Sequence, residues 1–146
     1  TGLFGGRKGS NPTLIGYSLM HHTLADLQRI ADIQFSDIVL TTFMIEHKLR
    51  IMLRDMGFID VHLSQKLSKI FSFHWETKDE VGAIYRYDNF PDKNWSYLPS
   101  YPHHFHRGTQ NVVEVPPFPL TILEGFISFM EFVRSEIEQS KIGLSK

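Results

Sequence analysis

The amino-acid sequence predicts an α+β protein: an antiparallel meander sheet of about five strands, with an N-terminal helix and a C-terminal helix on its apolar face. The first observation behind this prediction is the alternation of apolar and polar residues along short segments between residues 37 and 88. Such alternation is typical of antiparallel strands with one face on a core. The second observation is that apolar residues recur at helical spacing near both ends of the chain.

The N-terminal part of the chain divides into a tail and a helix. Residues 1–13 are rich in glycine and can bury little surface. We therefore expect a flexible tail, with residues 14–146 forming a single α+β domain. Thr23 followed by Asp26 resembles a capping box, which favours a helix start at this point. The apolar stripe of this helix consists of Met20, Leu24, Leu27 and Ala31.

Five segments carry the alternation of strands. A turn at Asp55-Met56-Gly57 joins two of them, because Gly57 is free to adopt a positive φ. A proline-bounded loop at 89–102 follows the last of the five, and we expect short extended pieces at 103–106 and 112–115. An amphipathic helix is expected at 123–138. The five predicted strands are 37–45, 46–54, 58–64, 70–76 and 83–88.

The composition limits the classes of function. The chain has 15 basic and 16 acidic residues and a formal net charge of −1, so nucleic-acid binding has to rest on a local patch. It contains no cysteine, which excludes disulfides, thiolate metal sites and a cysteine nucleophile and favours a cytoplasmic location. No apolar run approaches the roughly 20 residues that cross a bilayer, so we expect no membrane association.

Residues 71–108 hold four of the eight histidines and both tryptophans. On an extended strand, His104 and His106 point to one side, whereas His103 points to the other. Two imidazoles on one face can act as general acid and general base. They can also bind one metal ion with a third ligand from a neighbouring strand, or they can be structural, with their nitrogens bonded to the backbone.

The strands before this cluster carry further candidates. Asp88 can cap the turn that follows it, or it can orient a histidine or complete a metal site. Arg86, on the same face, can bind a phosphate or pair with Asp88 or Glu76. His74 lies on the less apolar side of its own strand. These residue types in this order indicate a polar site built on the sheet.

We expect His104 and His106 to face one cleft, with Asp88 or His74 about one side-chain length away, since the hairpin that carries them is the nearest partner in sequence. The tyrosines and tryptophans of 85–101 are expected to wall this cleft and to offer flat surfaces for bases.

A basic row forms a separate candidate site. Lys48, Arg50 and Arg54 fall on one face of a predicted strand. Such a row can follow a phosphate backbone, and it can equally be an ordinary solvated face.

Three motifs occur in order: FHW at 73–75, IYRYDN at 84–89 and YPHHFHRG at 101–108, followed by VVEV and the C-terminal helix. Together they resemble the TumE-like toxin family of prokaryotic toxin–antitoxin systems over about residues 38–138. The first 35 residues lie outside the family's core pattern. Carried over residue by residue, the resemblance points to His74, Asp88, Asn89, His103, His104 and His106.

The resemblance implies a toxin whose partner is a helix-turn-helix antitoxin, and it implies this role more firmly than a reaction. Our leading hypothesis is a metal-independent ribonuclease that needs no cofactor. One histidine would be the base and another the acid, while Arg86 or Lys48 would stabilise the phosphorane charge. The sequence leaves open whether the chain forms a homodimer.

Two alternatives remain at this stage. The first is a metal-dependent hydrolase or nuclease with His104, His106 and either Asp88 or His74 as ligands. The second is a non-enzymatic binding module with structural histidines. Since exposed histidines contribute little to folding, we expect alanine at both His104 and His106 to change the unfolding free energy by less than about 1 kcal/mol and to abolish toxicity.

Overall fold

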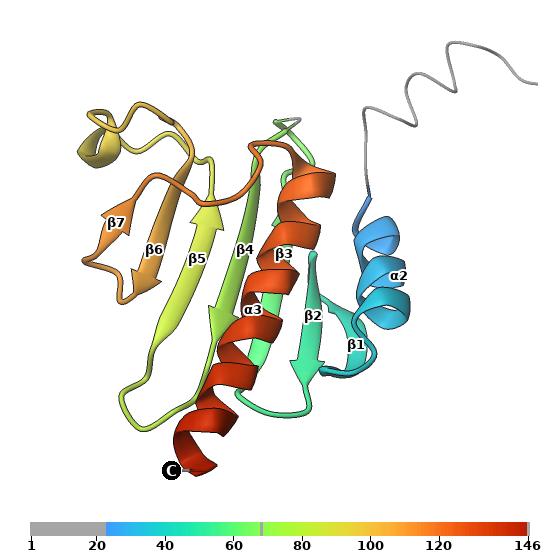
Figure 1. Cartoon of the computed structure of the whole chain (residues 1–146). Helices are drawn as coiled ribbons and strands as arrows, with labels where there is room; N and C mark the ends of the chain where they lie inside the picture. Colours follow the sequence, from blue (N-terminus) through green and yellow to red (C-terminus); the bar gives the residue numbers. More distant parts are fainter. Residues whose placement is uncertain (1–22, 68, 146) are drawn as a thin grey trace, which may run out of the picture.

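The computed structural model describes residues 23–67 and 69–145. Its seven strands form one antiparallel sheet in which each strand pairs with the next in sequence (Figure 1). The strands are β1 (Val39–Ile45), β2 (Lys48–Leu53), β3 (Phe58–Leu63), β4 (Phe71–Glu76), β5 (Ile84–Asp88), β6 (His104–Gly108) and β7 (Val113–Glu114). The helices are α2 (Leu24–Gln34), α3 (Ile122–Ser145) and a short 3₁₀ helix, η1 (Lys93–Trp95).

The predicted fold class is confirmed: an antiparallel meander with one helix before it and one after it. The number of strands is higher than the predicted five, because the extended pieces near 103–106 and 112–115 also join the sheet as β6 and β7. Neither α2 nor α3, the two α-helices in the described part of the chain, is long and apolar enough to cross a membrane.

Helix α2 begins as the capping box predicted. The backbone N–H of Asp26 donates to the Thr23 hydroxyl oxygen at 3.3 Å, and the backbone N–H of Thr23 donates to the Asp26 carboxylate at 2.9 Å. Leu27 and Ala31 of the predicted stripe are buried. Met20 and the predicted tail lie outside the described residues.

The core lies between the sheet and the two helices. Figure 1 shows α3 running across one face of the sheet, with α2 beside β1 and β2. The aromatic rings of Phe73 and Phe126 meet edge to face with centroids 5.4 Å apart, an arrangement that adds attraction to the burial of apolar area. The fully buried side chains of this core include Leu49, Ile51, Ile59, Val61, Phe71, Trp75, Tyr87, Phe105 and Phe129.

The other face of the sheet, which we call the polar face, carries the alternate residues of the same strands. From β3 to β6, each strand pairs with the next without a shift in register. The cross-strand pairing therefore aligns these polar-face residues in two rows. The first row contains Asp60, His74, Arg86 and His106, and the second contains His62, Ser72, Asp88 and His104.

The start of the predicted strand 46–54 is wrong. Its second residue, His47, is exposed in a two-residue turn between β1 and β2. Glu46, the first residue of this turn, has φ 57°. Strand β2 therefore begins at Lys48, two residues later than the predicted strand 46–54.

The predicted turn at Gly57 is confirmed, with φ 85°. The backbone passes so close to β4 that a Cβ at this position would lie 1.8 Å from the carbonyl oxygen of Glu76. Only glycine therefore fits this turn, which sets the register between β2 and β3.

We expect Gly57→Ala to lower the unfolding free energy by more than about 3 kcal/mol, because the methyl group adds a backbone clash to the strain of a positive φ. Gly82→Ala is the matched control, since Gly82 has φ 68° and no atom within 4 Å of an added Cβ. Its cost is expected to be about 1–2 kcal/mol. Urea denaturation measures the unfolding free energy of both variants. Equal losses of unfolding free energy would contradict the close approach of the backbone at Gly57.

Candidate functional site: a histidine–aspartate cluster on the polar face

Asp88, His104 and His106 form a cluster on the polar face, as expected for the two histidines. Asp88 is the cross-strand partner of His104, and His106 pairs with Arg86 in the same register. The Nε2 of His104 lies 3.2 Å from Oδ1 of Asp88, and the centroids of the two imidazole rings are 5.1 Å apart. All three side chains are buried, with relative exposures of 3 %, 3 % and 7 %.

Backbone carbonyls fix the tautomer of each imidazole. The Nδ1–H of His104 donates to the carbonyl of Pro102 at 3.0 Å, and the Nδ1–H of His106 donates to the carbonyl of Gln110 at 3.1 Å. A carbonyl oxygen can only accept, so Nδ1 carries the proton on both rings. The Nε2 atoms are therefore the ones left for chemistry.

Asp88 caps the turn that follows it, as the sequence suggested, and it also contacts Arg86. Its Oδ1 accepts the backbone N–H of Phe90 at 2.9 Å, which closes the turn after β5. Its Oδ2 accepts the Nε–H of Arg86 at 2.8 Å. Burial alone would raise the pKa of Asp88, but its contacts with His104 and Arg86 outweigh burial and lower the pKa.

The pKa values of the two histidines move in opposite directions. Burial acts to lower the pKa of His104, but the hydrogen bond and charge of Asp88 outweigh it and raise the pKa above 6.5. Burial lowers the pKa of His106 below 6.5, and the hydrogen bond to Gln110 only partly opposes this. Of the two rings, His104 therefore keeps its second proton to a higher pH than His106 does.

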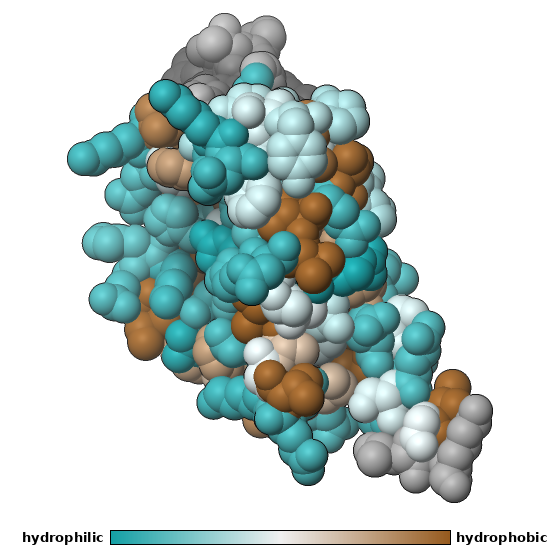
Figure 2. Space-filling model, turned by 90° about the vertical axis from the view of Figure 1, so that its left-hand side faces the viewer, coloured by the Kyte–Doolittle hydropathy of each residue, from teal (hydrophilic) through white to brown (hydrophobic). Residues whose placement is uncertain are grey.

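A cavity of about 370 Å³ opens over the cluster. The loop after β5 builds one wall of it: η1 is capped by Asp92, and the Trp95 ring centroid lies 6.3 Å from that of His104 and 6.0 Å from that of His106. Figure 2, viewed from the side of β7, shows a mainly hydrophilic surface with scattered apolar groups. The remaining lining residues are Arg86, Phe90, Asp92 and Gln110.

The expected aromatic wall is only partly present. Trp95 and Phe90 line the cavity, whereas Tyr85 and Tyr87 point to the core face of β5. Tyr97 is 70 % exposed and does not line the cavity. The loop at 89–102 has no period in its sequence, so only the structure could show which of its rings turn toward the histidines.

The other residues to which the family resemblance points lie outside the cluster. His74 is on the polar face, and its Nε2–H donates to Glu76 at 3.0 Å. His103 is on the core side, where its Nδ1 lies 3.2 Å from the Tyr87 hydroxyl. Asn89 accepts the backbone N–H of Phe71 at 2.9 Å and donates to the carbonyl of Lys69 at 2.6 Å, so it joins the entrance of β4 to the end of β5.

The predicted basic row is largely ion-paired. Arg50 makes two hydrogen bonds of 2.8 Å with Asp60, and Lys48 lies 3.1 Å from the same carboxylate. Arg54 follows the end of β2 and donates to the carbonyl of Ser36 at 3.2 Å. A role in nucleic-acid binding for these residues stays a prediction. The alternation of β3 could have revealed Asp60, because it places this carboxylate opposite Arg50.

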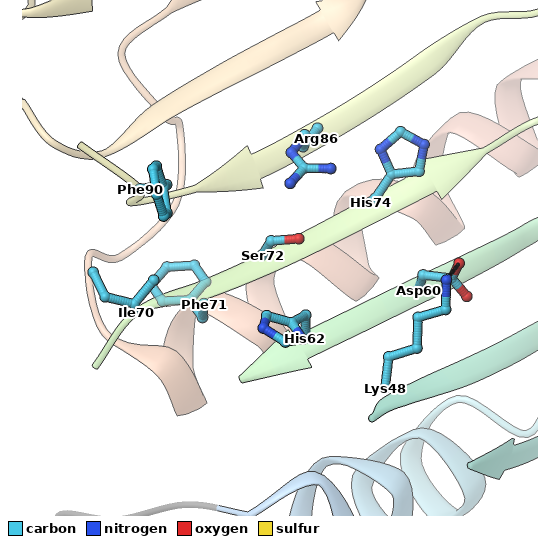
Figure 3. Close-up of a pocket in the computed structure, with 9 residues that line it drawn as sticks. All are labelled: Lys48, Asp60, His62, Ile70, Phe71, Ser72, His74, Arg86 and Phe90. Carbon is cyan, nitrogen blue, oxygen red and sulfur yellow. Dashed lines mark ion pairs between the residues drawn. The ribbon is translucent and has the colours of Figure 1, made fainter. Parts of the chain in front are cut away.

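A second cavity, of about 410 Å³, adjoins the first on the polar face (Figure 3). The two share Arg86 and Phe90 as lining residues. We call the second cavity the polar groove. Its other lining residues are Lys48, Asp60, His62, Ile70, Phe71, Ser72 and His74.

The cluster also has the composition of a metal site. One potential ligand atom from each of Asp88, His104 and His106 lies within 4.8 Å of the others. The hydrogen bonds from Nδ1 to backbone carbonyls are of the kind that orients histidine ligands. The residues that could hold a metal are thus the same residues that could move protons.

The fold and the cluster define a class: a small α+β protein with a buried histidine–aspartate site on the open face of an antiparallel sheet. The chain belongs to the TumE toxin family, since the family model described as Toxin TumE matches residues 21–137. The match begins before α2, so the expectation that the first 35 residues lie outside the family pattern is wrong for residues 21–35, while residues 1–20 do lie outside the match. Comparisons with curated proteins and with solved structures gave no match. Membership gives the chain a toxin role and implies an antitoxin partner.

The burial of the histidines corrects one premise. The expectation that alanine at His104 and His106 is nearly neutral assumed exposed side chains, but both are buried and hydrogen-bonded. Truncation would leave two carbonyls and one Asp88 oxygen short of a partner, with an expected cost of about 2–4 kcal/mol. Glutamine keeps more of the volume and polarity and is the better replacement.

We expect Asp88→Asn to lower the pKa of His104 from above 6.5 to below 6.5, because burial then acts without the opposing carboxylate charge. NMR titration of the imidazole Cε1–H signal measures this change. Asp92→Asn is the control, since the charge of Asp92 raises the pKa of His104 much less than the contact with Asp88 does. An unchanged His104 pKa in Asp88→Asn would contradict the role assigned to this carboxylate.

Proposed function

We propose that this toxin cleaves RNA at the histidine–aspartate cluster by general acid–base catalysis. One observation carries the proposal: the Nε2 atoms of the two imidazoles differ in their surroundings. Nε2 of His104 lies beside Asp88, whereas Nε2 of His106 has no hydrogen-bond partner among the described residues. Two neighbouring imidazoles with opposite proton preferences suit a reaction that removes one proton and delivers another.

The proposed reaction is an internal transfer within the RNA strand. Nε2 of His106 takes the proton of a ribose 2′-hydroxyl, and the 2′-oxygen bonds to the adjacent phosphorus. The bond from phosphorus to the 5′-oxygen breaks, and Nε2–H of His104 gives its proton to that oxygen. At 3.2 Å the contact between His104 and Asp88 is long for a hydrogen bond, so this proton can be shared with the leaving oxygen. The products are a 2′,3′-cyclic phosphate and a 5′-hydroxyl.

Arg86 is better placed than Lys48 to stabilise the phosphorane. Arg86 lines the cavity over the cluster, whereas Lys48 lines only the polar groove. The Nε–H of Arg86 is bonded to Asp88, which holds the guanidinium at the edge of the site. Its terminal nitrogens are then available to a phosphate. His74 would support this placement as the cross-strand neighbour of Arg86.

A second candidate function is metal-dependent hydrolysis at the same residues. The specific observation that favours it is the closeness of the three potential ligand atoms, all within 4.8 Å. Asp88, His104 and His106 would hold the ion, which would supply Lewis-acid activation of a phosphate or of water.

For the partner, we propose a helix-turn-helix antitoxin encoded together with the toxin. The family supports an antitoxin partner, while the type of antitoxin, the cytoplasmic site of action and a homodimer remain our predictions.

We expect the rate of RNA cleavage to follow a bell-shaped pH profile with its maximum between the lowered pKa of His106 and the raised pKa of His104. The rate falls as the pH drops through the lowered pKa of His106, because the base becomes protonated. It falls again as the pH rises through the raised pKa of His104, because the acid loses its proton. Each of His106→Gln and His104→Gln should lower the rate by about 10²–10⁴-fold and remove its own limb of the profile.

The control for these variants is His47→Gln, since His47 is an exposed histidine in the turn before β2. Growth inhibition on expression without antitoxin is the second readout. If the cluster variants are folded and as toxic as the wild type, the histidines are structural and the non-enzymatic alternative is favoured.

The metal content of the protein separates the two catalytic candidates. We expect protein purified without added metal or chelator to hold well below one equivalent of zinc, nickel, manganese or iron, and we expect EDTA to leave cleavage unchanged. A stoichiometric metal that is lost in His104→Gln, together with inhibition by EDTA, would favour the metal-dependent candidate instead.

A further inference from the structure

The polar groove has no role in the chemistry proposed so far. It lies over β2 to β5, and it meets the cavity of the cluster at Arg86 and Phe90. In Figure 3, Arg86 and His74 lie on one side of Ser72, with Lys48 and Asp60 further along the sheet. An RNA strand bound across the histidine–aspartate cluster therefore has a continuous path into this groove.

The groove holds cationic groups that an anion could contact. Lys48 lines it and shares the carboxylate of Asp60 with Arg50, so this one carboxylate serves two positive charges. The exposed imidazole of His62 and the guanidinium of Arg86 add further donors. In a chain with a formal net charge of −1, this is a local patch that fits an anion such as a phosphodiester.

Two features of the lining fit a nucleotide more than a bare anion. Phe90, at the boundary of the two cavities, is 59 % exposed and offers an aromatic face. Nδ1 of His74 is a buried nitrogen without a hydrogen-bond partner among the described residues. A carboxylate can only accept, so the neutral ring of His74 donates from Nε2 to Glu76 and leaves Nδ1 as an acceptor at the wall of the groove.

We propose that the polar groove binds the nucleotide next to the scissile phosphate of a single-stranded RNA. Lys48 holds the phosphate of this nucleotide and its base stacks on Phe90, while Arg86, where the two cavities meet, stays with the scissile phosphate. This inference rests on the proposed function, and it specifies the substrate as an unpaired strand of at least two nucleotides. A base inside a duplex is already stacked and paired and cannot lie on Phe90.

Binding of a cleavage-resistant strand tests the groove apart from the chemistry. The probe is a fluorescein-labelled, fully 2′-O-methylated oligouridine, followed by fluorescence anisotropy at several salt concentrations. We expect Phe90→Ala to weaken binding about fivefold or more through lost stacking. We expect Lys48→Gln to make the slope of log K against log salt less negative by about 0.7, the value for one phosphate contact on a single strand.

Two matched controls accompany these variants. Lys141→Gln removes another lysine paired with an aspartate, since Lys141 lies 3.4 Å from Asp55 on the α3 side of the molecule. Tyr97→Ala removes an aromatic ring that is 70 % exposed outside both cavities. Both controls should bind the probe as the wild type does, and the same strand annealed to its complement should bind more weakly.

The outcomes separate the two proposals. Suppose that the wild type cleaves unmodified RNA, but Lys48→Gln binds the probe as Lys141→Gln does and Phe90→Ala binds it as Tyr97→Ala does. This result overturns the proposed role of the groove and leaves the proposed chemistry standing. Binding that depends on Lys48 and Phe90 without any cleavage supports the groove and rejects the chemistry. Equal or tighter binding of the duplex, or equal binding of uridine monophosphate, overturns the assignment to a single strand.

Discussion

The register between β5 and β6 is the constraint on which the site depends. It places Asp88 opposite His104 and Arg86 opposite His106, so four polar side chains meet on one face while Tyr87 and Phe105 meet on the other. A slip of one residue would turn every side chain of β6 to the opposite face and would put the two histidines into the aromatic core. The hydrophobic core therefore selects the register, and the register assembles the cluster.

Burying three ionisable groups is unfavourable unless each finds partners, and the cluster meets this condition with backbone groups. The carbonyls of Pro102 and Gln110 accept from the two imidazoles, and the N–H of Phe90 donates to Asp88. The only buried side-chain polar atom in the described ranges that lacks a partner is Nδ1 of His74, which lies in the adjoining groove. The loops on either side of β6 thus contribute to the electrostatics of the site as well as to its shape.

Much of this arrangement could be predicted from the sequence because it follows from periodicity. The period of two placed Asp88 with Arg86 and His104 with His106, and the capping box at Thr23 marked the start of α2. Burial of the histidines could not be predicted, since it depends on the loop that carries Trp95. The contact of Asp60 with Lys48 and Arg50 was not predicted, although the alternation of β3 places this carboxylate opposite Arg50.

Helix α3 covers one face of the sheet and leaves the other open, which has a consequence for how such a protein can diverge. Adjacent residues on β4 are therefore under different constraints. Phe73 and Trp75 have to pack in the core, whereas Ser72 and His74 lie on the polar face, which α3 leaves open to binding partners. Away from the buried cluster, substitutions on the open face remove little apolar contact, so they cost little folding free energy. One scaffold can thus acquire new target preferences through its open face while the helix-covered face stays the same.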